Sequence, residues 1–366
     1  MSVPPEWEPG LSAIRALKAG SVVLIVGASD RGKTTFVQQV ARRLTLDGVK
    51  TAIADTDIGQ SEIGPPGTVG VTGARREWAE NPNARLTDLK PGATFFVGAF
   101  APASVALELT VAAAQAVRFA RGAGAQRILV DTTGFVSGPA ARRLKVAKAQ
   151  VIAPALVIGI GKPGEIDSLL TALTAATGAE SLSLPVPGDV GRKSTAFRAT
   201  RRMTRLAAAF EDAQETALPL RDLRTVGCTL GSGDPVSPEL VRWAAESLRL
   251  PIVRAEKGEN QLHLFVTGRP RAVPDAAIAP VATYFKVSSV RLVSLAHYVD
   301  ALLGFQDGSG RLLGVGRFLG LDADRDEMTV SAPRTVTADR TRMVFVGRVR
   351  VPADANGHVD IRPGEL

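Results

Sequence analysis

The sequence lacks the features of a secreted or membrane-spanning protein. Its 366 residues include a single cysteine, Cys228, so no internal disulfide bond can form and the cytoplasm is the expected compartment. The N-terminal segment MSVPPEWEPGLSAIRALKAG has no basic region followed by an apolar run, so we expect no signal peptide. No stretch approaches the roughly 18 consecutive apolar residues that a bilayer-spanning helix needs. We therefore expect a soluble protein without membrane contact.

Composition indicates a globular and basic chain. The hydrophobic fraction is 45% and the charged fraction is 22%, which are ordinary values for a folded protein. The length suits one large domain with a hydrophobic core and a smaller second one. The net charge of +8 and the pI near 10.0 favour a polyanionic partner such as nucleic acid. An arginine-rich proteome would give the same charge balance, so the net charge alone does not establish a polyanionic partner.

Up to about Leu220, short apolar runs alternate with helical patterns. Such alternation predicts a parallel sheet covered by helices, with ligands bound at the carboxyl ends of its strands. Two of the helical patterns cover Ala103–Arg121 and Gly164–Thr177. The predicted strands are Ser21–Val26, Thr51–Ala54, Thr94–Val97, Arg127–Val130, Ala155–Ile160 and Ser181–Leu184.

From about Arg221 onward the pattern changes to short strands broken by Gly and Asp-Gly turns, for example in GFQDGSGRLLGVGRFLGLD. One helix, roughly Ser237 to Leu248, interrupts them. We find no repeats, low-complexity tracts or long linker. The sequence thus predicts a P-loop domain over residues 1–220 and a smaller β-rich domain over residues 221–366.

The strongest motif is IVGASDRGKTTF, which fits the P-loop (Walker A) spacing G-x-x-x-x-G-K-[ST]. An apolar strand precedes it and a helical pattern follows, as the motif requires; the alternative is a glycine-rich turn before an ordinary helix. Backbone amides of such a loop and the helix N-terminus bind phosphate. Lys33 would bridge the outer phosphates and Thr34 would bind Mg²⁺. The expected nucleotide-binding residues are Gly27, Ala28, Ser29, Asp30, Arg31, Gly32, Lys33, Thr34 and Thr35.

A second motif, AIADTDIGQSEIGPPG, ends the second strand with two carboxylates, Asp55 and Asp57. If the strand continued regularly, residues i and i+2 would point to the same face. Phosphoryl transfer needs a carboxylate that organises the metal, and a kinase also needs a group that orients the attacking hydroxyl. The acid pair could supply both, although Asp and Gly also dominate ordinary solvated turns.

A third motif, RILVDTTGFVSG, ends an apolar strand with Asp131, a usual position for a carboxylate that reaches Mg²⁺ through water. The pattern D-x-x-G also occurs in GTPases, and that ambiguity is real. Phe135, just beyond the strand end, would make sense as a platform on which a base stacks. It could equally be a core phenylalanine.

The fourth feature is GRKSTAFRATRRMTRLAAAF, in which Arg198, Arg202 and Arg205 share one helix face and Arg201 lies close beside. In a P-loop protein the obvious anion for this stripe is the triphosphate, and we expect an arginine lid over about residues 188–210. The alternative is a solvated basic face.

Together these motifs resemble the polynucleotide 5′-hydroxyl kinase family of RNA processing. That family includes the kinase subunit of the eukaryotic cleavage factor, the kinase of pre-ribosomal RNA processing and shorter archaeal relatives. Its D-x-D-x-G-Q motif matches Asp55, Asp57, Gly59 and Gln60, followed here by a family-like GPPG. Its T-x-G-W clasp matches the TTGF segment, and its R-x-x-x-R lid matches Arg198 and Arg202. The C-terminal part also resembles the family's small C-terminal domain.

Two departures from the family stand out. The clasp tryptophan is Phe135 here, whose smaller ring can still stack on a base. Fewer than twenty-five residues precede the P-loop, so the N-terminal β-domain of the eukaryotic members is not expected. Since that domain belongs to partner assembly, the resemblance implies a free-standing enzyme with no obligate protein partner.

The resemblance implies transfer of the γ-phosphate of ATP to the 5′-hydroxyl of single-stranded or end-exposed RNA or DNA, with Mg²⁺. Its implied catalytic residues are Lys33, Asp57, Arg198 and Arg202, with Asp57 favoured over Asp55 as the base. The implied metal residues are Thr34, Asp55 and Asp131. The implied substrate-binding residues are Asp55, Gln60, Thr132, Thr133, Gly134, Phe135 and Arg192.

Two other functions stay open at this point. A protein of this lineage could hold ATP as a structural ligand and act as a scaffold, because likeness of fold does not fix function. The DTTG segment would also fit a P-loop GTPase switch or metallochaperone. Such a protein needs a guanine-reading N-K-x-D element, and GKPGEID after the fifth strand lacks the asparagine and the acid at the right spacing.

Overall fold

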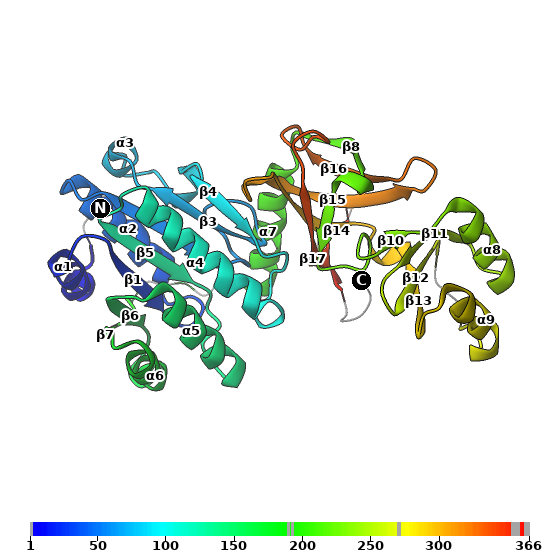
Figure 1. The fold of residues 1–366 in the computed structure, drawn as a ribbon. Helices are drawn as coiled ribbons and strands as arrows, with labels where there is room; N and C mark the ends of the chain where they lie inside the picture. The colour runs from blue at the N-terminus through cyan, green and yellow to red at the C-terminus, as the bar shows by residue number, and fades with distance from the viewer. Residues whose placement is uncertain (1–2, 189–190, 192–193, 269–271, 353–358, 362–366) are drawn as a thin grey trace. The chain divides into compact units, whose positions relative to one another are not determined.

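The protein is described from a computed structural model that covers residues 3–188, 191, 194–268, 272–352 and 359–361. Its chain folds into two compact units, Met1–Leu206 and Ala207–Leu366 (Figure 1). Among the described residues, no helix combines the length and the apolar character needed to cross a membrane.

The first unit is built on a seven-stranded sheet in the order β4-β3-β2-β5-β1-β6-β7. Five of its strands are parallel neighbours, and β3 and β4 add an antiparallel edge. This is the expected α/β fold of a P-loop domain, and the prediction of that fold is confirmed. The strands are β1 (Ser21–Val26), β2 (Thr51–Thr56), β3 (Thr68–Gly73), β4 (Ala93–Phe96), β5 (Arg127–Thr132), β6 (Leu156–Ile160) and β7 (Glu180–Leu184).

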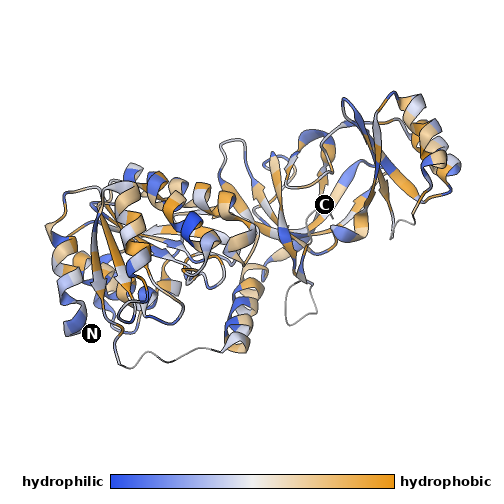
Figure 2. Cartoon of the chain, turned by 90° about the horizontal axis from the view of Figure 1, so that it is seen from below, coloured by the Kyte–Doolittle hydropathy of each residue, from blue (hydrophilic) through white to orange (hydrophobic). Residues whose placement is uncertain are grey.

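Helices cover both faces of this sheet because its central strands are apolar on both sides. One face packs against α1 and α2, with Trp7, Phe36 and Ile25 in a shared core. The neighbouring helices α4, α5 and α6 lie on the other face (Figure 1). In Figure 2 the strands of this sheet are mainly orange, whereas the helices mix both colours. The helices are α1 (Glu8–Ala16), α2 (Lys33–Leu46), α3 (Arg76–Glu80), α4 (Ala106–Gly122), α5 (Pro139–Ile152), α6 (Asp167–Thr177) and α7 (Thr195–Ala209), with 3₁₀ turns at Pro5–Trp7, Leu86–Asp88 and Pro102–Ser104.

The sequence pattern missed one strand of this sheet. The segment TVGVTG forms β3, although its two glycines are typical of a turn. It is stabilised by antiparallel pairing on both sides, with β2 and β4. Tertiary pairing therefore outweighs the weak local preference of this segment.

The second unit contains two sheets with the orders β10-β11-β12-β13 and β18-β17-β14-β15-β16-β8, with β9 paired to β17. Because β8 pairs with β16, residues 213–219 belong to a sheet of this unit. The strands are β8 (Ala213–Pro219), β9 (Arg224–Val226), β10 (Asp234–Pro235), β11 (Ile252–Lys257), β12 (Gln261–Val266), β13 (Ser289–Ser294), β14 (Ala301–Gln306), β15 (Leu312–Asp322), β16 (Glu327–Pro333), β17 (Met343–Arg350) and β18 (Val359–Asp360), with 3₁₀ turns at Leu220–Asp222 and Leu295–His297.

The expectation of a single helix in this part of the chain was wrong. The expected helix is α8 (Pro238–Leu248), and a second one, α9 (Asp275–Phe285), packs beside it. Pro280 lies inside α9, where it removes one backbone donor and weakens the local helical pattern. Burial of Val281 and Phe285 in the core shared with α8 stabilises the helix instead.

Candidate active site

The P-loop joins β1 to α2 with the geometry of a phosphate-binding turn. Gly32 precedes the first helical residue in the left-handed conformation (φ 87°), and Asp30 is also left-handed (φ 57°), which aspartate tolerates. The buried Lys33 donates from Nζ to the carbonyl of Ala28 at 2.8 Å. The hydroxyl of Thr34 donates to Oδ2 of Asp131 at 2.6 Å. The loop thus presents an ammonium and a hydroxyl at the N-terminus of a 14-residue helix.

A cavity of about 720 Å³ opens over this loop. It is large enough for a nucleotide. Residues from the P-loop, the loop after β2, the clasp and α7 all line it, although they are far apart in the sequence. Of the residues expected from the sequence, those that line it are Ser29, Asp30, Arg31, Gly32, Lys33, Thr34, Thr35, Asp57, Gln60, Gly134 and Arg198.

The other expected residues do not line this cavity. Among them, Gly27, Asp55, Asp131, Thr132 and Thr133 are buried, and Ala28 and Phe135 are half-buried. Arg202 contacts the loop after β2 instead. Arg192 lies outside the described residues.

The two carboxylates of the second motif have different surroundings. Asp55 is buried, and its oxygens accept hydrogen bonds from the amides of Asp57 (3.0 Å), Glu62 (2.5 Å) and Ile63 (3.1 Å). Asp57 lines the cavity, and its Oδ1 accepts from the amides of Gly59 and Gln60, both at 3.2 Å. Asp55 therefore holds the loop together, whereas Asp57 faces the space in which a substrate would bind.

Burial shapes the charge of this acid cluster. Desolvation raises the pKa of Asp55 well above its ordinary value, and the charges of Asp131 and Asp57 raise it further. Desolvation also raises the pKa of Asp131 to about 6, although Lys33 and the Thr34 hydroxyl favour its ionised form. A cation bound here would relieve the repulsion among these carboxylates.

The oxygen donors suit Mg²⁺. The described residues contain no group of three or more His, Cys, Asp or Glu side chains that could hold a metal by themselves. Magnesium in phosphoryl-transfer sites takes few protein ligands and completes its shell with phosphate and water, so the pair Thr34 and Asp131 fits that requirement.

The clasp segment packs directly on the P-loop. A side chain at Gly134 would place its Cβ 2.2 Å from Oγ and 2.6 Å from the amide nitrogen of Ser29, so only glycine allows this approach. The Thr132 hydroxyl donates to the carbonyl of Ile25 at 2.8 Å, which fixes the end of β5 against β1. The half-buried Phe135 follows directly, so its position is coupled to the phosphate loop.

The arginines of α7 contact protein anions and carbonyls. Arg198 pairs with Asp30 of the P-loop at 2.5 Å, and Arg201 lies 2.6 Å from Glu62. Arg202 donates to the carbonyl of Gly59 at 3.1 Å, and its guanidinium lies 5.0 Å from the ring centre of Phe100. Arg205 donates to the carbonyls of Glu62 and Gly64 at 3.0 and 2.9 Å. This face of α7 therefore covers the loop that carries Asp57.

Three contacts at this site had no clear signal in the sequence. Glu165 binds Arg31 of the P-loop through two hydrogen bonds, at 2.8 and 2.6 Å, which lower the pKa of that carboxyl to about 2. Glu62 is the partner of Arg201, and only its place next to the D-x-D-x-G-Q motif hinted at a role. Trp7, from the N-terminal segment, also lines the cavity and packs edge-on against Phe36.

The positive charge of the chain is concentrated in this unit. Through Leu206 the sequence has 25 Lys and Arg and 16 Asp and Glu, a net charge of +9. The rest of the chain has 19 Lys and Arg and 20 Asp and Glu, a net charge of −1. The basic balance noted from the sequence therefore belongs to the unit that holds the P-loop.

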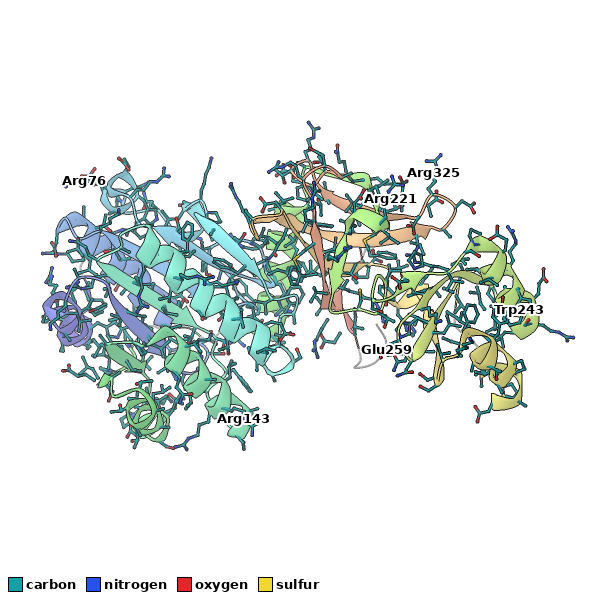
Figure 3. All side chains as sticks on the ribbon, in the orientation of Figure 1. Arg76, Arg143, Arg221, Trp243, Glu259 and Arg325 are labelled. Carbon is teal, nitrogen blue, oxygen red and sulfur yellow. The ribbon has the colours of Figure 1, made fainter. Side chains whose placement is uncertain are left out.

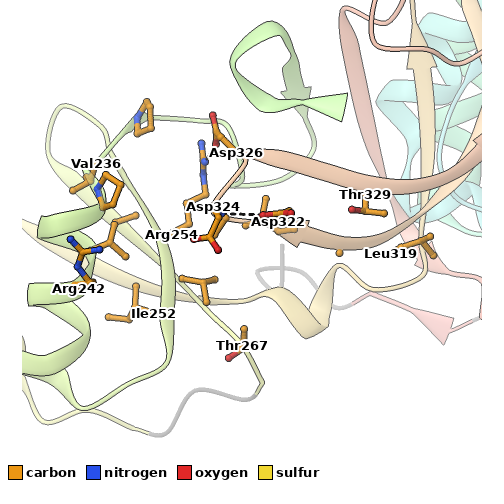
Figure 4. A pocket seen from close by; sticks show the side chains of 18 of the residues that line it. Val236, Arg242, Ile252, Arg254, Thr267, Leu319, Asp322, Asp324, Asp326 and Thr329 are labelled. Carbon is orange, nitrogen blue, oxygen red and sulfur yellow. Dashed lines mark hydrogen bonds and ion pairs between the residues drawn. The ribbon is translucent and has the colours of Figure 1, made fainter. Parts of the chain in front are cut away.

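A larger cavity of about 1040 Å³ lies in the second unit (Figure 4). Arg254 extends into it and pairs with Glu256 at 2.7 Å and with Asp326. No residue expected from the sequence lines this cavity, and its buried arginine is satisfied by protein carboxylates. We therefore place the candidate active site in the first unit.

Known proteins with similar sequences or folds match nearly the whole chain. The family model described as mRNA cleavage and polyadenylation factor CLP1 P-loop matches residues 27–212. The polyribonucleotide 5′-hydroxyl-kinase of Pyrococcus furiosus is 25% identical over 352 residues, which cover 96% of this chain and 94% of the relative. The enzyme of that name from Thermococcus kodakarensis is 26% identical over 367 residues, which cover 100% of this chain and 97% of the relative.

Solved structures also have a similar fold. A chain in the structure of the wild-type Clp1p–Pcf11p (454–563) complex matches with a TM-score of 0.60 at 12% identity, and the match covers 95% of this chain and 79% of that chain. At this identity the likeness shows the fold alone.

Proposed function

Because this chain belongs to the mRNA cleavage and polyadenylation factor CLP1 P-loop family, we propose that it is an ATP-dependent polynucleotide 5′-hydroxyl kinase. The observation that carries the proposal is the convergence of Lys33, Thr34 and Asp57 on one cavity. A phosphate-binding loop alone would fit any P-loop enzyme. A carboxylate that faces the same cavity adds what a kinase needs beyond a binding loop, a group that can accept the proton of the attacking hydroxyl.

The P-loop would hold the triphosphate of ATP. Its backbone amides and Lys33 would bind the phosphates, in agreement with the helix N-terminus that starts at Lys33. Thr34 and Asp131 would hold a Mg²⁺ ion, which neutralises charge on the phosphates when bound. Asp55 has its oxygens engaged by loop amides, so we assign it the positioning of the loop rather than a metal contact.

Asp57 would act on the substrate end. The 5′-oxygen of the polynucleotide would form a bond to the γ-phosphorus, and the bond from that phosphorus to the bridging oxygen of ADP would break. The proton of the 5′-hydroxyl would pass to a carboxylate oxygen of Asp57. The amides of Gly59 and Gln60 hold Oδ1 of this carboxylate, which leaves Oδ2 for the substrate.

Arg198 and Arg202 would close over the transferred phosphate. In the structure Arg198 pairs with Asp30, a residue of the phosphate loop itself. A triphosphate would repel Asp30 and attract Arg198, so this arginine would exchange one anion for the other when ATP binds. An arginine delivered in this way stabilises the charge that develops on the phosphoryl group.

The substrate would be a nucleic acid with a free 5′-hydroxyl. Gln60 and the clasp, Thr132 to Phe135, would position its terminal nucleotide, and Arg192 is a further proposed contact. The net charge of +9 on the first unit supports a polyanionic substrate. The names of the two relatives favour RNA over DNA. All these residues belong to the first unit, Met1–Leu206, so we assign catalysis to that unit and propose the rest of the chain as an accessory β-rich domain.

Transfer of label from γ-labelled ATP tests this proposal. The purified protein is incubated with Mg²⁺ and matched 5′-hydroxyl RNA and DNA oligonucleotides, next to Lys33→Ala. Lys50→Ala is the matched control because it removes an exposed lysine of the same unit outside the cavity. We expect label on the oligonucleotide with the wild type and with Lys50→Ala, and none with Lys33→Ala. Tight ATP binding without any transfer would instead support an ATP-binding scaffold.

A further inference from the structure

Helix α5 carries two lysines that are completely buried beneath the candidate active site. Lys145 and Lys148 are three residues apart, so they share one face of the helix, and each has an exposed fraction of 0%. Buried ammonium groups are costly unless other groups compensate them. The chemistry described above uses neither lysine, so their burial needs another explanation.

Each lysine binds a different strand end at the edge where the active site lies. Lys145 donates to the carbonyl of Thr133 at 2.8 Å, with the Thr133 hydroxyl at 3.4 Å. Thr133 is the second residue of the clasp. Lys145 therefore fixes the backbone of the segment that leads to Gly134 and Phe135.

Lys148 binds the end of β2 instead. Its Nζ donates to the hydroxyl of Thr56 at 2.9 Å, and that hydroxyl donates to the main-chain carbonyl of Asp131 at 2.6 Å. The hydroxyl accepts from the lysine through one of its lone pairs, and its proton points toward β5. This chain of two hydrogen bonds fixes Thr56, the residue directly before Asp57.

The carboxylates of the site compensate the charge of the two lysines. Asp55, Asp57 and Asp131 all favour the charged form of Lys148, while burial lowers its pKa to about 8. Burial lowers the pKa of Lys145, and the charge of Lys148 lowers it further. Asp57 and Asp131 act in the opposite direction and favour the charged form of Lys145. The lysines and acids are therefore one buried cluster, in which the carboxylates favour the charged form of each lysine.

We propose that Lys145 and Lys148 are positioning residues with separate tasks, Lys145 holding the clasp for the polynucleotide and Lys148 holding the end of β2 so that Asp57 meets the reacting hydroxyl. The division of tasks rests on the function proposed above. The hydrogen bonds on which it is built are independent of that function, so it can be tested with and without turnover.

The two lysines serve as controls for each other because they have equal burial and lie on one helix. We expect Lys145→Met to raise the KM for a 5′-hydroxyl oligonucleotide by about 10-fold or more, with kcat and the KM for ATP within about 3-fold. We expect Lys148→Met to lower kcat by about 10-fold or more, with both KM values within about 3-fold. Arg143→Met removes a charge from the exposed face of the same helix (Figure 3) and should change none of these values.

Milder variants cover the case in which a methionine variant does not fold. Thr56→Val removes the acceptor of Lys148 and should reproduce the fall in kcat. Lys145→Gln keeps a shorter donor near Thr133 and should raise the oligonucleotide KM less than Lys145→Met does. If both lysine variants change the same parameter, or only lower the amount of folded enzyme, the separate tasks are refuted.

Amide hydrogen exchange distinguishes this failure from failure of the proposed function. Lys145→Met should accelerate exchange in residues 132–137 and leave residues 56–63 unchanged, and Lys148→Met should do the reverse. If the two variants show this pattern but the wild type has no kinase activity, the proposed kinase function is refuted and the positioning roles are supported. Uniform acceleration, or none, in an active enzyme would refute the positioning roles and leave the kinase standing.

Discussion

Exchanging each acid of the D-x-D-x-G-Q loop for asparagine should separate folding from chemistry. The two residues are close in sequence, and the sequence alone did not decide which is the base. In the structure Asp55 accepts hydrogen bonds from the amides of Asp57, Glu62 and Ile63 and from the hydroxyl of Ser61. Asp57 lines the cavity, and its Oδ1 accepts from the amides of Gly59 and Gln60. We therefore expect Asp55→Asn to affect stability and Asp57→Asn to affect turnover.

The magnitude for Asp55→Asn follows from these bonds. Both oxygens of Asp55 accept from backbone amides, and an asparagine keeps only one acceptor, so its NH₂ group must face at least one amide donor. Losing a hydrogen bond to a charged group costs about 1.5–3 kcal/mol. Relief of the repulsion with Asp57 and Asp131 offsets a part of that cost. The free energy of unfolding should fall by about 2 kcal/mol, which lowers the Tm by roughly 4–8 °C for a unit of this size.

Asp57→Asn should lower kcat and leave the stability of the protein nearly unchanged. Both amides donate to the same oxygen, Oδ1, so an asparagine with its oxygen in that place keeps both bonds. The Tm should stay within about 2 °C of the wild type. Removal of a general base lowers kcat by about 10²–10⁴-fold, and ATP binding should stay normal because the P-loop is unchanged.

The assay combines thermal unfolding, ATP binding and kcat at saturating ATP and 5′-hydroxyl oligonucleotide for both variants. Thermal unfolding shows whether a loss of kcat reflects unfolded protein. The reverse result, a stable but inactive Asp55→Asn together with an active Asp57→Asn, would refute the assignment of the two carboxylates.

Two further changes probe the clasp and the P-loop. Phe135→Ala should raise the KM for the oligonucleotide by about 5–150-fold, because stacking on one base contributes about 1–3 kcal/mol, while the KM for ATP stays constant; an unchanged oligonucleotide KM in steady-state kinetics would exclude the stacking role. Glu165→Gln should lower the free energy of unfolding by about 1 kcal/mol at pH 7, since the partly exposed pair with Arg31 is screened by solvent. The Arg31 hydrogen bonds lower the pKa of Glu165 from 4.5 to about 2, so its stabilisation is complete above pH 4.5 and is lost as the pH falls toward 2. Denaturant unfolding at several pH values should therefore show that the difference in the free energy of unfolding between the wild type and Glu165→Gln disappears in acid. A difference that does not change with pH would contradict an origin in the ionised Glu165.

Local sequence determined the P-loop and its flanking elements. The apolar run SVVLIV forms β1 with the predicted bounds, and the helix begins at Lys33, directly after the glycine that turns the chain. These elements were predictable because strand, turn and helix depend on neighbouring residues. The matches at Asp55, Asp131 and Arg198 depended on spacing within short segments, so the sequence indicated the family as well.

Tertiary structure decided what each of these side chains contacts. The rule that residues i and i+2 share a face applies only within a strand, and β2 ends at Thr56. The chain turns there, so Asp55 stays buried at the end of the strand, whereas Asp57 in the following loop lines the cavity. Likewise, the arginine stripe of α7 was visible in the sequence, but its partners Asp30 and Glu62 come from segments more than one hundred residues earlier.

Other features had no local signal at all. The segment that forms β3 is strand only because two neighbours pair with it. Lys145 and Lys148 look like ordinary helix residues, and their burial depends on α5 lying over the ends of β2 and β5. Sequence periodicity reports which residues face a core, whereas long-range packing decides which polar groups meet inside it, and the chemistry of this site depends on those contacts.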